Sequence, residues 1–307
     1  MPGVTSWTKT TPTQATRTQA TPPAALPPEL PRPATGTSRG VLRPDDGSGR
    51  PQSSRYQPSA AVGTYVEHYW TVRWDHPAPA TRAVLGHPAI HITVEHGDGS
   101  MHDHDLPAAL VHGVVRRTFA VDLTPSGWVF GARFRPGGFT ALTGLAASAY
   151  TDRVVAATDV FADAAELRDA ILASDDDTAR GAAFNAWLTP RLPDRVEPGY
   201  DELVELVTWI LADRSVQRAD DVAAAAGCSL RTLQRRFERS IGVGPKWLIT
   251  RYRLHDALAA IDGDTGDEPI DLAGLAASLG WFDQAHFTRD FTAHVGVSPQ
   301  AYRARPR

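Results

Sequence analysis

The sequence predicts an α+β protein, with a β-rich amino-terminal domain followed by an all-α domain built from a repeated pair of helices. Two observations carry this prediction. A pattern in the last third of the chain occurs twice, and the preceding region holds short aromatic and β-branched segments typical of strands. The chain has 307 residues, so two domains fit its length once a low-complexity start is set aside.

The repeated pattern starts at Asp221 and again at Asp271. Six positions recur at one offset: Leu233, Arg235, Phe237, Gly242, Val243 and Pro245 return as Phe287, Arg289, Phe291, Gly296, Val297 and Pro299. Upstream, Gly227 matches Gly280 at an offset one residue shorter, so the second copy has one extra residue in its turn. Each copy predicts a short Ala-rich helix, a turn at Gly and a second helix, which is the helix-turn-helix plan.

The second helix of each copy is predicted to be amphipathic. Ser229 and Asp283 are suitable N-caps, and the Leu and Phe positions of the repeat share one face. The outward-facing candidates for base contacts are Arg231, Gln234 and Arg235 in the first copy and Gln284, Ala285, Thr288 and Arg289 in the second. Arg can pair with guanine and Gln with adenine in the major groove of DNA. In one helix alone, an ordinary solvated face would show the same residues. Two helices with such faces favour recognition of DNA bases.

Residues 199–307 resemble the DNA-binding domain of the AraC/XylS family of transcription regulators. The resemblance lies in GWFDQAHFTRDFTAHVGVSPQAYR of the second copy and in SLRTLQRRF and RYRLHDALAAI of the first. It implies two helix-turn-helix units joined by one helix over about Lys246 to Ile261. It also implies that the seven base-contact candidates enter successive major-groove segments about 34 Å apart. Ala285 is too small to form a hydrogen bond there, so it would read a thymine methyl group or no base.

Positive charge is local in this sequence. The chain carries a net charge of −4, yet seven Arg and Lys residues accompany only Glu238 between Ser229 and Arg253. Arg236, Arg239 and Lys246 are predicted to contact phosphates, which fix register without reading sequence. Acidic residues gather at Asp201, Glu202 and Glu205 and over 262–271, and we expect them to lie away from DNA.

The amino-terminal part divides into two regions. Residues 1–58 contain eleven of the 24 Pro residues and predict a disordered tail. Residues 59–192 predict a β-rich sensor or dimerisation domain with a helical linker. Its predicted strands are 65–72, 90–94, 109–115, 118–123 and 128–134, and its predicted helices are 139–145, 159–172 (capped by Asp159) and 179–188. The segment GARFRPGGFTALTG resembles a poorly characterised domain that precedes the DNA-binding domain in some AraC/XylS members.

Two features of this domain suggest ligand sites. Six His residues lie between 87 and 112, and His91, His102 and His104 are the candidates for metal ligands. The favoured interpretation is a hairpin with exposed His and no metal; the alternative is a cupin-like metal-binding enzyme or metal sensor fused to the DNA-binding domain. Arg133 and Arg135 precede a Gly-rich turn and could hold an anionic effector, although the turn could equally serve only to end a strand.

No recognisable catalytic arrangement occurs, so we expect a regulator rather than an enzyme. The single residue Cys228 excludes an intrachain disulfide, in agreement with a cytoplasmic protein. No segment has the length or apolarity of a signal peptide or membrane span. The expected partners are double-stranded DNA and an unknown small-molecule effector, with RNA polymerase and a second copy of the chain as further candidates. No cofactor is expected.

Overall fold

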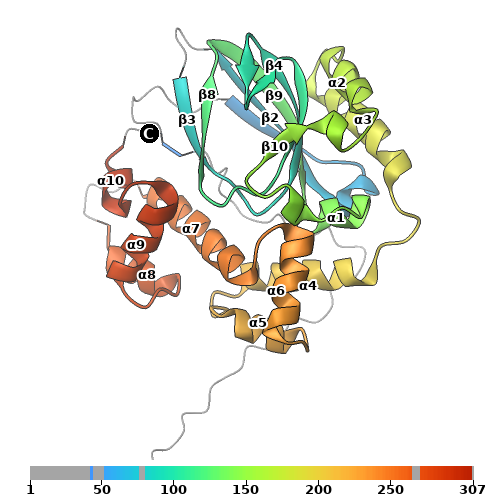
Figure 1. Cartoon of the computed structure of the whole chain (residues 1–307). Coiled ribbons are helices and arrows are strands. Elements are labelled where there is room, and N and C mark those ends of the chain that lie inside the picture. The colour runs from blue at the N-terminus through green and yellow to red at the C-terminus, as the bar shows by residue number, and fades with distance from the viewer. Residues whose placement is uncertain (1–41, 44–51, 76–79, 265–269, 306–307) are drawn as a thin grey trace, which may run out of the picture.

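The computed structural model describes residues 42–43, 52–75, 80–264 and 270–305. It confirms the predicted α+β class: strands dominate the amino-terminal half, and the carboxyl-terminal half is helical (Figure 1). Within the described part of the chain, no helix combines the length and apolarity that crossing a membrane requires.

A six-stranded antiparallel sheet forms the centre of the amino-terminal half, in the order β1-β2-β9-β4-β7-β10. A separate pair, β3 and β8, and a small hairpin, β5 and β6, complete the strands. Their bounds are β1 Gln52–Tyr56, β2 Val66–Asp75, β3 Ala80–Leu85, β4 His91–Gly97, β5 Ser100–Met101, β6 His104–Asp105, β7 Ala108–His112, β8 Thr118–Leu123, β9 Ser126–Phe134 and β10 Val154–Ala156. We call residues 52–192 the β-domain.

The two faces of the six-stranded sheet meet different surroundings, because successive side chains of a strand point to opposite sides. In β4, Ile92 and Val94 enter a buried apolar cluster that also holds Leu167 and Phe184 from two covering helices. His91, Thr93 and Glu95 point the other way, into a cavity that residues of β3 and β8 line on the opposite side. Thr93 and Glu95 are buried, so the polar face of β4 is covered rather than turned to solvent.

Short helices cover the apolar face and lead out of the β-domain (Figure 1). They are η1 Val62–Thr64, α1 Gly138–Thr143, η2 Ala147–Ala149, η3 Ala157–Asp159, α2 Ala164–Leu172, α3 Asp177–Leu188 and η4 Thr189–Arg191. The predicted cap at Asp159 is wrong, because Ala157–Asp159 forms a separate turn of 3₁₀ helix and α2 begins after Asp163. The spacing of polar and apolar residues alone did not separate this 3₁₀ turn from helix α2.

The carboxyl-terminal half follows the repeat. Its helices are α4 Pro198–Ala212, α5 Ala219–Ala225, α6 Leu230–Ile241, α7 Pro245–Gly263, α8 Leu272–Ser278, α9 Gln284–Val295 and α10 Pro299–Arg303. In each unit a left-handed glycine ends the second helix, Gly242 with φ 97° and Gly296 with φ 89°. Glycine adopts this conformation without the steric cost that other residues meet, so the equivalent glycines of the repeat terminate equivalent helices.

Helix α7 is buried on nearly every side. Leu248 and Tyr252 pack with the first helix-turn-helix unit, whereas Leu258 and Ile261 pack with the second. Leu85 of the β-domain joins the same cluster as Leu258. Helix α7 therefore connects three packed regions, and a change in its position would alter the relation between the two units.

The predicted tail of 1–58 needs correction where its residues are described. Residues 52–56 form strand β1, which pairs with β2, and Tyr56 donates a hydrogen bond to Asp177 at 2.7 Å. Leu42 and Arg43 are buried, and Arg43 donates to Asp262 at 2.7 Å and to the carbonyl of Ile261 at 3.0 Å. These contacts join residues that are far apart in the sequence, so local composition could not predict them. Residues 1–41 and 44–51 lie outside the described residues.

Candidate nucleic-acid interface and enclosed cavity

Helices α6 and α9 are capped as predicted. The Ser229 hydroxyl accepts a hydrogen bond from the Thr232 N–H at 3.1 Å, and the Asp283 carboxylate accepts one from the His286 N–H at 2.6 Å. Each cap satisfies a backbone donor of the first turn that lacks an intrahelical partner. The one-residue longer turn of the second copy therefore still ends in a capped helix.

The inward faces of both helices are formed by the repeated apolar positions. Phe237 and Phe291 are 0% exposed, as are Leu233 and Phe287. Burial of such side chains contributes roughly 1.5–3 kcal/mol each, which ties both helices to their units. The outer faces of α6 and α9 carry exposed residues, and the carboxyl-terminal end of α6 also contacts the β-domain.

The predicted base-contact residues lie on those outer faces. Those with exposed side chains are Arg231, Gln234 and Arg235 on α6 and Gln284, Ala285 and Arg289 on α9, whereas Thr288 is half-buried. Phe282, in the turn before α9, is 92% exposed, although sequence reasoning did not single it out. Its position beside the Asp283 cap is the signal that could have drawn attention to it.

The predicted phosphate contacts differ in their surroundings. Lys246, at the start of α7, is exposed. Arg239 is also exposed and donates to the Gly144 carbonyl of the β-domain at 3.4 Å. Arg236 donates to the carbonyl of Gly199 and to Glu202 at 3.0 Å, so part of its charge is already neutralised. Glu202, which we expected to lie away from DNA, is thus next to a predicted phosphate contact.

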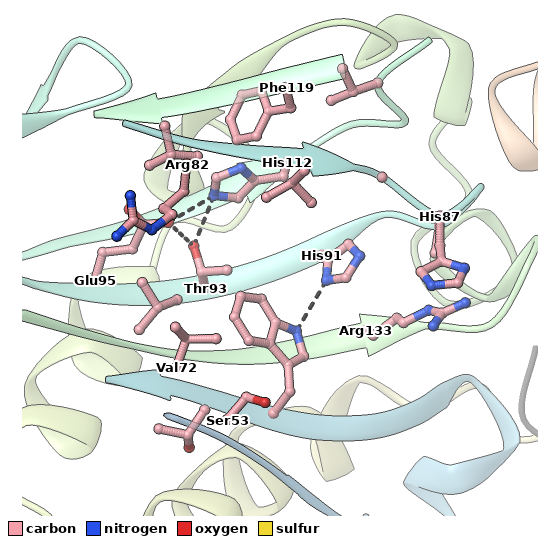
Figure 2. A pocket seen from close by; sticks show the side chains of 18 of the residues that line it. Ser53, Val72, Arg82, His87, His91, Thr93, Glu95, His112, Phe119 and Arg133 are labelled. Atoms are coloured by element: carbon pink, nitrogen blue, oxygen red, sulfur yellow. Dashed lines mark hydrogen bonds and ion pairs between the residues drawn. The ribbon is translucent and has the colours of Figure 1, made fainter. Parts of the chain in front are cut away.

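A cavity of about 240 Å³ lies between the six-stranded sheet and the β3–β8 pair (Figure 2). Its walls combine apolar and aromatic side chains with polar and charged ones. The polar residues among them include Arg82, His87, His91, Thr93, Glu95, His102, His112 and Arg133. A concave site in which apolar walls accompany polar groups that can orient a ligand is typical of small-molecule binding.

Only part of the predicted His cluster lies together. Figure 2 shows the Glu95 and His112 side chains linked on neighbouring strands, with His112 Nε2 at 2.9 Å from Glu95 Oε1. His102 Nε2 lies 3.6 Å from Glu95 Oε2. His91 instead accepts a hydrogen bond from the Trp70 indole at 3.1 Å, and His104 does not line the cavity.

Charges around Glu95 favour a carboxylate. Burial opposes its ionisation, yet the hydrogen bond from His112 and the charges of His112 and His102 hold the pKa of Glu95 below its ordinary value. Burial lowers the pKa of His102, against the opposing charge of Glu95. Glu95 is therefore a carboxylate that lies beside two imidazole rings.

Of the two arginines predicted to hold an anion, one reaches the cavity. Arg133 lines it and is 2% exposed, with its Nε 3.5 Å from Glu67 Oε2. Arg135 donates through Nε to the Gly63 carbonyl at 2.9 Å and ties the end of β9 to η1. The two side chains are therefore not gathered into one anion site.

The cavity reaches helix α7 at one end. Gly86 and His87 line the cavity, and the His87 ring stacks on the ring of His255 in α7 at 3.8 Å and 3°. Arg251, also in α7 and 0% exposed, donates to the carbonyl of Arg116 at 2.7 Å and to that of Gly86 at 3.4 Å. The cavity wall at Gly86 and His87 is thus in direct contact with helix α7.

Two capped helix-turn-helix units, joined by one connecting helix, follow the β-domain and its cavity in the chain. This arrangement defines a class of DNA-binding fold. Comparison with known proteins agrees with this assignment of the helical half. Residues 222–305 match the model of a helix-turn-helix domain, and residues 54–156 match a domain of unknown function (DUF6597). The carboxyl-terminal domain is a helix-turn-helix domain of the kind found in AraC-like regulators.

Three known proteins illustrate the similarity. A protein described as an AraC-like transcription regulator of Streptomyces antibioticus is 34% identical over 86 residues, which are 28% of this chain and 27% of that protein. The HTH-type transcriptional regulator MtrA of Neisseria gonorrhoeae is 27% identical over 134 residues, 44% of this chain and 40% of MtrA. The chain thus spans less than half the length of either relative. A crystal structure of apo ToxT from Vibrio cholerae matches with a TM-score of 0.41 and 13% identity, over 78% of this chain and 98% of ToxT.

Proposed function

We propose that this protein is a sequence-specific DNA-binding transcription regulator whose β-domain responds to a small molecule. One observation carries the proposal: α6 and α9 bury matching apolar faces, and each exposes Arg and Gln side chains on its outer face, with Arg235 and Arg289 at equivalent positions. Such a helix fits the major groove of DNA, and its polar side chains can reach base edges. The matched helix-turn-helix domain and the two regulator relatives support the same function.

Base reading is assigned to the outer faces of α6 and α9. Arg235 and Arg289 are equivalent in the repeat, and each can form two hydrogen bonds to one guanine. The complete proposed set is Arg231, Gln234, Arg235, Gln284, Ala285, Thr288 and Arg289. The exposed ring of Phe282 adds an apolar contact at the entry to α9.

Phosphate binding is assigned to Arg239, Lys246 and Arg236. Lys246 and Arg239 are exposed cations near the end of α6, where they can meet the DNA backbone. Arg236 must exchange its contact with Glu202 for a phosphate, so its contribution is expected to be smaller. Phosphate contacts supply affinity that falls as the salt concentration rises.

Control by an effector follows from the contact between cavity and α7. An effector in the cavity lies against Gly86 and His87, whose neighbours across the interface are Arg251 and His255. If it favours one arrangement of this wall, it shifts α7 and with it the two helix-turn-helix units. The shift in DNA affinity is limited by the effector's differential affinity for the two arrangements. RNA polymerase contact and dimer formation stay predictions from the family resemblance.

The function is tested by selecting duplexes from a random library with the full chain, then measuring affinities at fixed salt. The proposal expects a selected sequence to bind about 10³-fold or more tightly than its scrambled version. The double variant Arg235→Ala with Arg289→Ala should lose this preference. Arg168→Ala on α2, which removes an exposed charge far from α6, should keep it. Equal affinity of the wild-type protein for all duplexes would overturn the proposal.

A further inference from the structure

Three potential metal ligands converge inside the cavity. Their ligand atoms, one each from Glu95, His102 and His112, all lie within 4.8 Å of one another. Zinc binds imidazole nitrogen and carboxylate oxygen at about 2.0–2.2 Å, which places neighbouring ligand atoms about 3–3.5 Å apart. Glu95 Oε1 lies 2.9 Å from His112 Nε2, and the second carboxylate oxygen, Oε2, lies 3.6 Å from His102 Nε2, so each oxygen is close to that spacing from one ring.

The three ligands come from three different parts of the β-domain. Glu95 is on β4 and His112 on the adjacent strand β7; the backbone partner of His112 is His91, and its ring reaches along β4 to Thr93 and Glu95. His102 comes from the β5–β6 hairpin, where it adopts a left-handed backbone with φ 54°. Asp103 beside it has φ 64°, and positive φ at both central residues is what a two-residue hairpin turn of this type requires. The His102 ring stacks on Phe119 of β8 at 4.9 Å.

A second observation concerns the carboxylate. Glu95 is 2% exposed, and its Oε2 atom accepts no hydrogen bond from the residues that the structure describes. Oε1, by contrast, accepts from the Thr93 hydroxyl at 2.9 Å. A buried carboxylate oxygen left without a donor is costly, and a cation is one way to satisfy it.

We infer that Glu95, His102 and His112 bind a divalent first-row transition metal of the zinc class within the cavity. Two imidazoles and one carboxylate form a ligand set that leaves coordination positions open. Because the three residues line the cavity, an open position would face its interior and could meet an oxygen or nitrogen atom of a bound small molecule. The metal would also tie the β5–β6 hairpin to the main sheet.

This site departs from both sequence-based expectations. From the sequence no cofactor is expected, and His91, His102 and His104 form the alternative ligand set. His102 alone is shared, because neighbouring strands and not sequence neighbours bring the ligands together. The inference goes beyond DNA binding and can be tested without DNA.

The test is calorimetric titration of the full, EDTA-treated and dialysed chain with Zn²⁺, together with thermal unfolding with and without Zn²⁺. We expect one equivalent to bind and the unfolding temperature to rise, since a ligand of the folded state stabilises it. Loss of a residue that supports a metal ligand costs about 10–100-fold in affinity, so loss of a direct ligand should cost at least that much. His102→Ala and Glu95→Gln are the test variants.

His104→Ala is the matched control, because it alters the same hairpin without touching the three ligands. It should bind Zn²⁺ as the wild type does. His102→Ala keeps the proposal testable if the buried Glu95 variant fails to fold, since His102 lies in a hairpin outside the main sheet. The inference is overturned if the folded wild type binds no Zn²⁺, or if folded His102→Ala binds it unchanged.

Discussion

Arg235 and Arg289 occupy equivalent positions of the repeat, and both side chains are exposed on the outer faces of their helices. Their neighbours Phe237 and Phe291 are completely buried. Because exposed positions contribute little to stability, the two arginines can be replaced without unfolding the helix-turn-helix units. Single substitutions therefore separate recognition from folding.

Arg235→Ala should reduce the free energy of binding to the selected duplex by about 1–3 kcal/mol and relax the preference at one base pair. Lys246→Ala is the comparison, and it should weaken binding to all sequences equally. The slope of log affinity against log salt concentration should become shallower by the amount that about one phosphate contact contributes. Affinities for duplexes with single base-pair changes, measured at several salt concentrations, give both results. A uniform loss in Arg235→Ala would make this arginine a phosphate contact instead.

His255 is a second residue with a specific expectation. Burial, and then the charges of Arg251 and Arg133, lower its pKa to about 3, while the Gly86 carbonyl acts in the opposite direction and the His87 ring stacks on it. The unfolded chain takes up a proton near the ordinary pKa of about 6.5, but folded His255 does not. Its contribution to stability is therefore complete above pH 6.5 and is lost as the pH falls toward 3.

Between pH 7 and pH 5 this loss should be about 2 kcal/mol in the free energy of unfolding. His255→Gln cannot take up the proton, so its stability should fall less over the same interval. Burial also lowers the pKa of His68 to about 4, and that contribution remains in both proteins. Urea unfolding at both pH values measures the difference, and parallel losses in the two proteins would contradict the assignment.

At the scale of elements, the sequence predicted what depends on local pattern. The two caps and the buried apolar faces of α6 and α9 follow from spacing and residue type. What it missed depends on distant partners. The strand β1, the burial of Leu42 and the grouping of Glu95 with His102 and His112 all require chain segments that meet only after folding.

Gly242 and Gly296 form a matched pair for the contact between α6 and the β-domain. Both have positive φ, so replacement by Ala should cost about 1–2 kcal/mol of backbone strain at either site. At Gly242 an added Cβ would also lie 2.8 Å from Thr151 Oγ1 and 3.3 Å from the Ala147 carbonyl oxygen, whereas nothing lies within 4 Å at Gly296.

Gly242→Ala should therefore destabilise the protein by about a further 1–3 kcal/mol relative to Gly296→Ala. Thr151 at present donates to the Gly242 carbonyl at 2.7 Å, and that contact would be disturbed. Unfolding curves of the two variants provide the comparison. Equal losses of stability would mean that α6 and the β-domain are not packed together as described.

At the scale of the whole molecule, α7 is the link between the cavity and DNA. It contributes to the cores of both helix-turn-helix units and holds two β-strand ends through Arg251 and His255. Figure 1 shows α7 running between the β-domain above and the paired helices on either side. A response to an effector is therefore expected to pass through this helix.

Arg251→Met should loosen the β-domain from α7, because the guanidinium donates to the carbonyls of Arg116 and Gly86. Amide hydrogen exchange should become faster around residues 84–87 and 116–118. Arg253→Met is the control: Arg253 donates to Gly280 and Val216 within the helical half, so its loss should leave exchange in those strands unchanged. Unaltered exchange in Arg251→Met would remove α7 as the connecting element.

The most direct measurement of the central claim is hydroxyl-radical footprinting of the full chain on a selected duplex. Two recognition helices on one connecting helix should protect two patches on one face of the DNA, about 10–10.5 base pairs apart between centres. Arg289→Ala should weaken the contacts of one patch and Arg235→Ala those of the other. A single protected patch, or protection spread evenly along the duplex, would contradict the account.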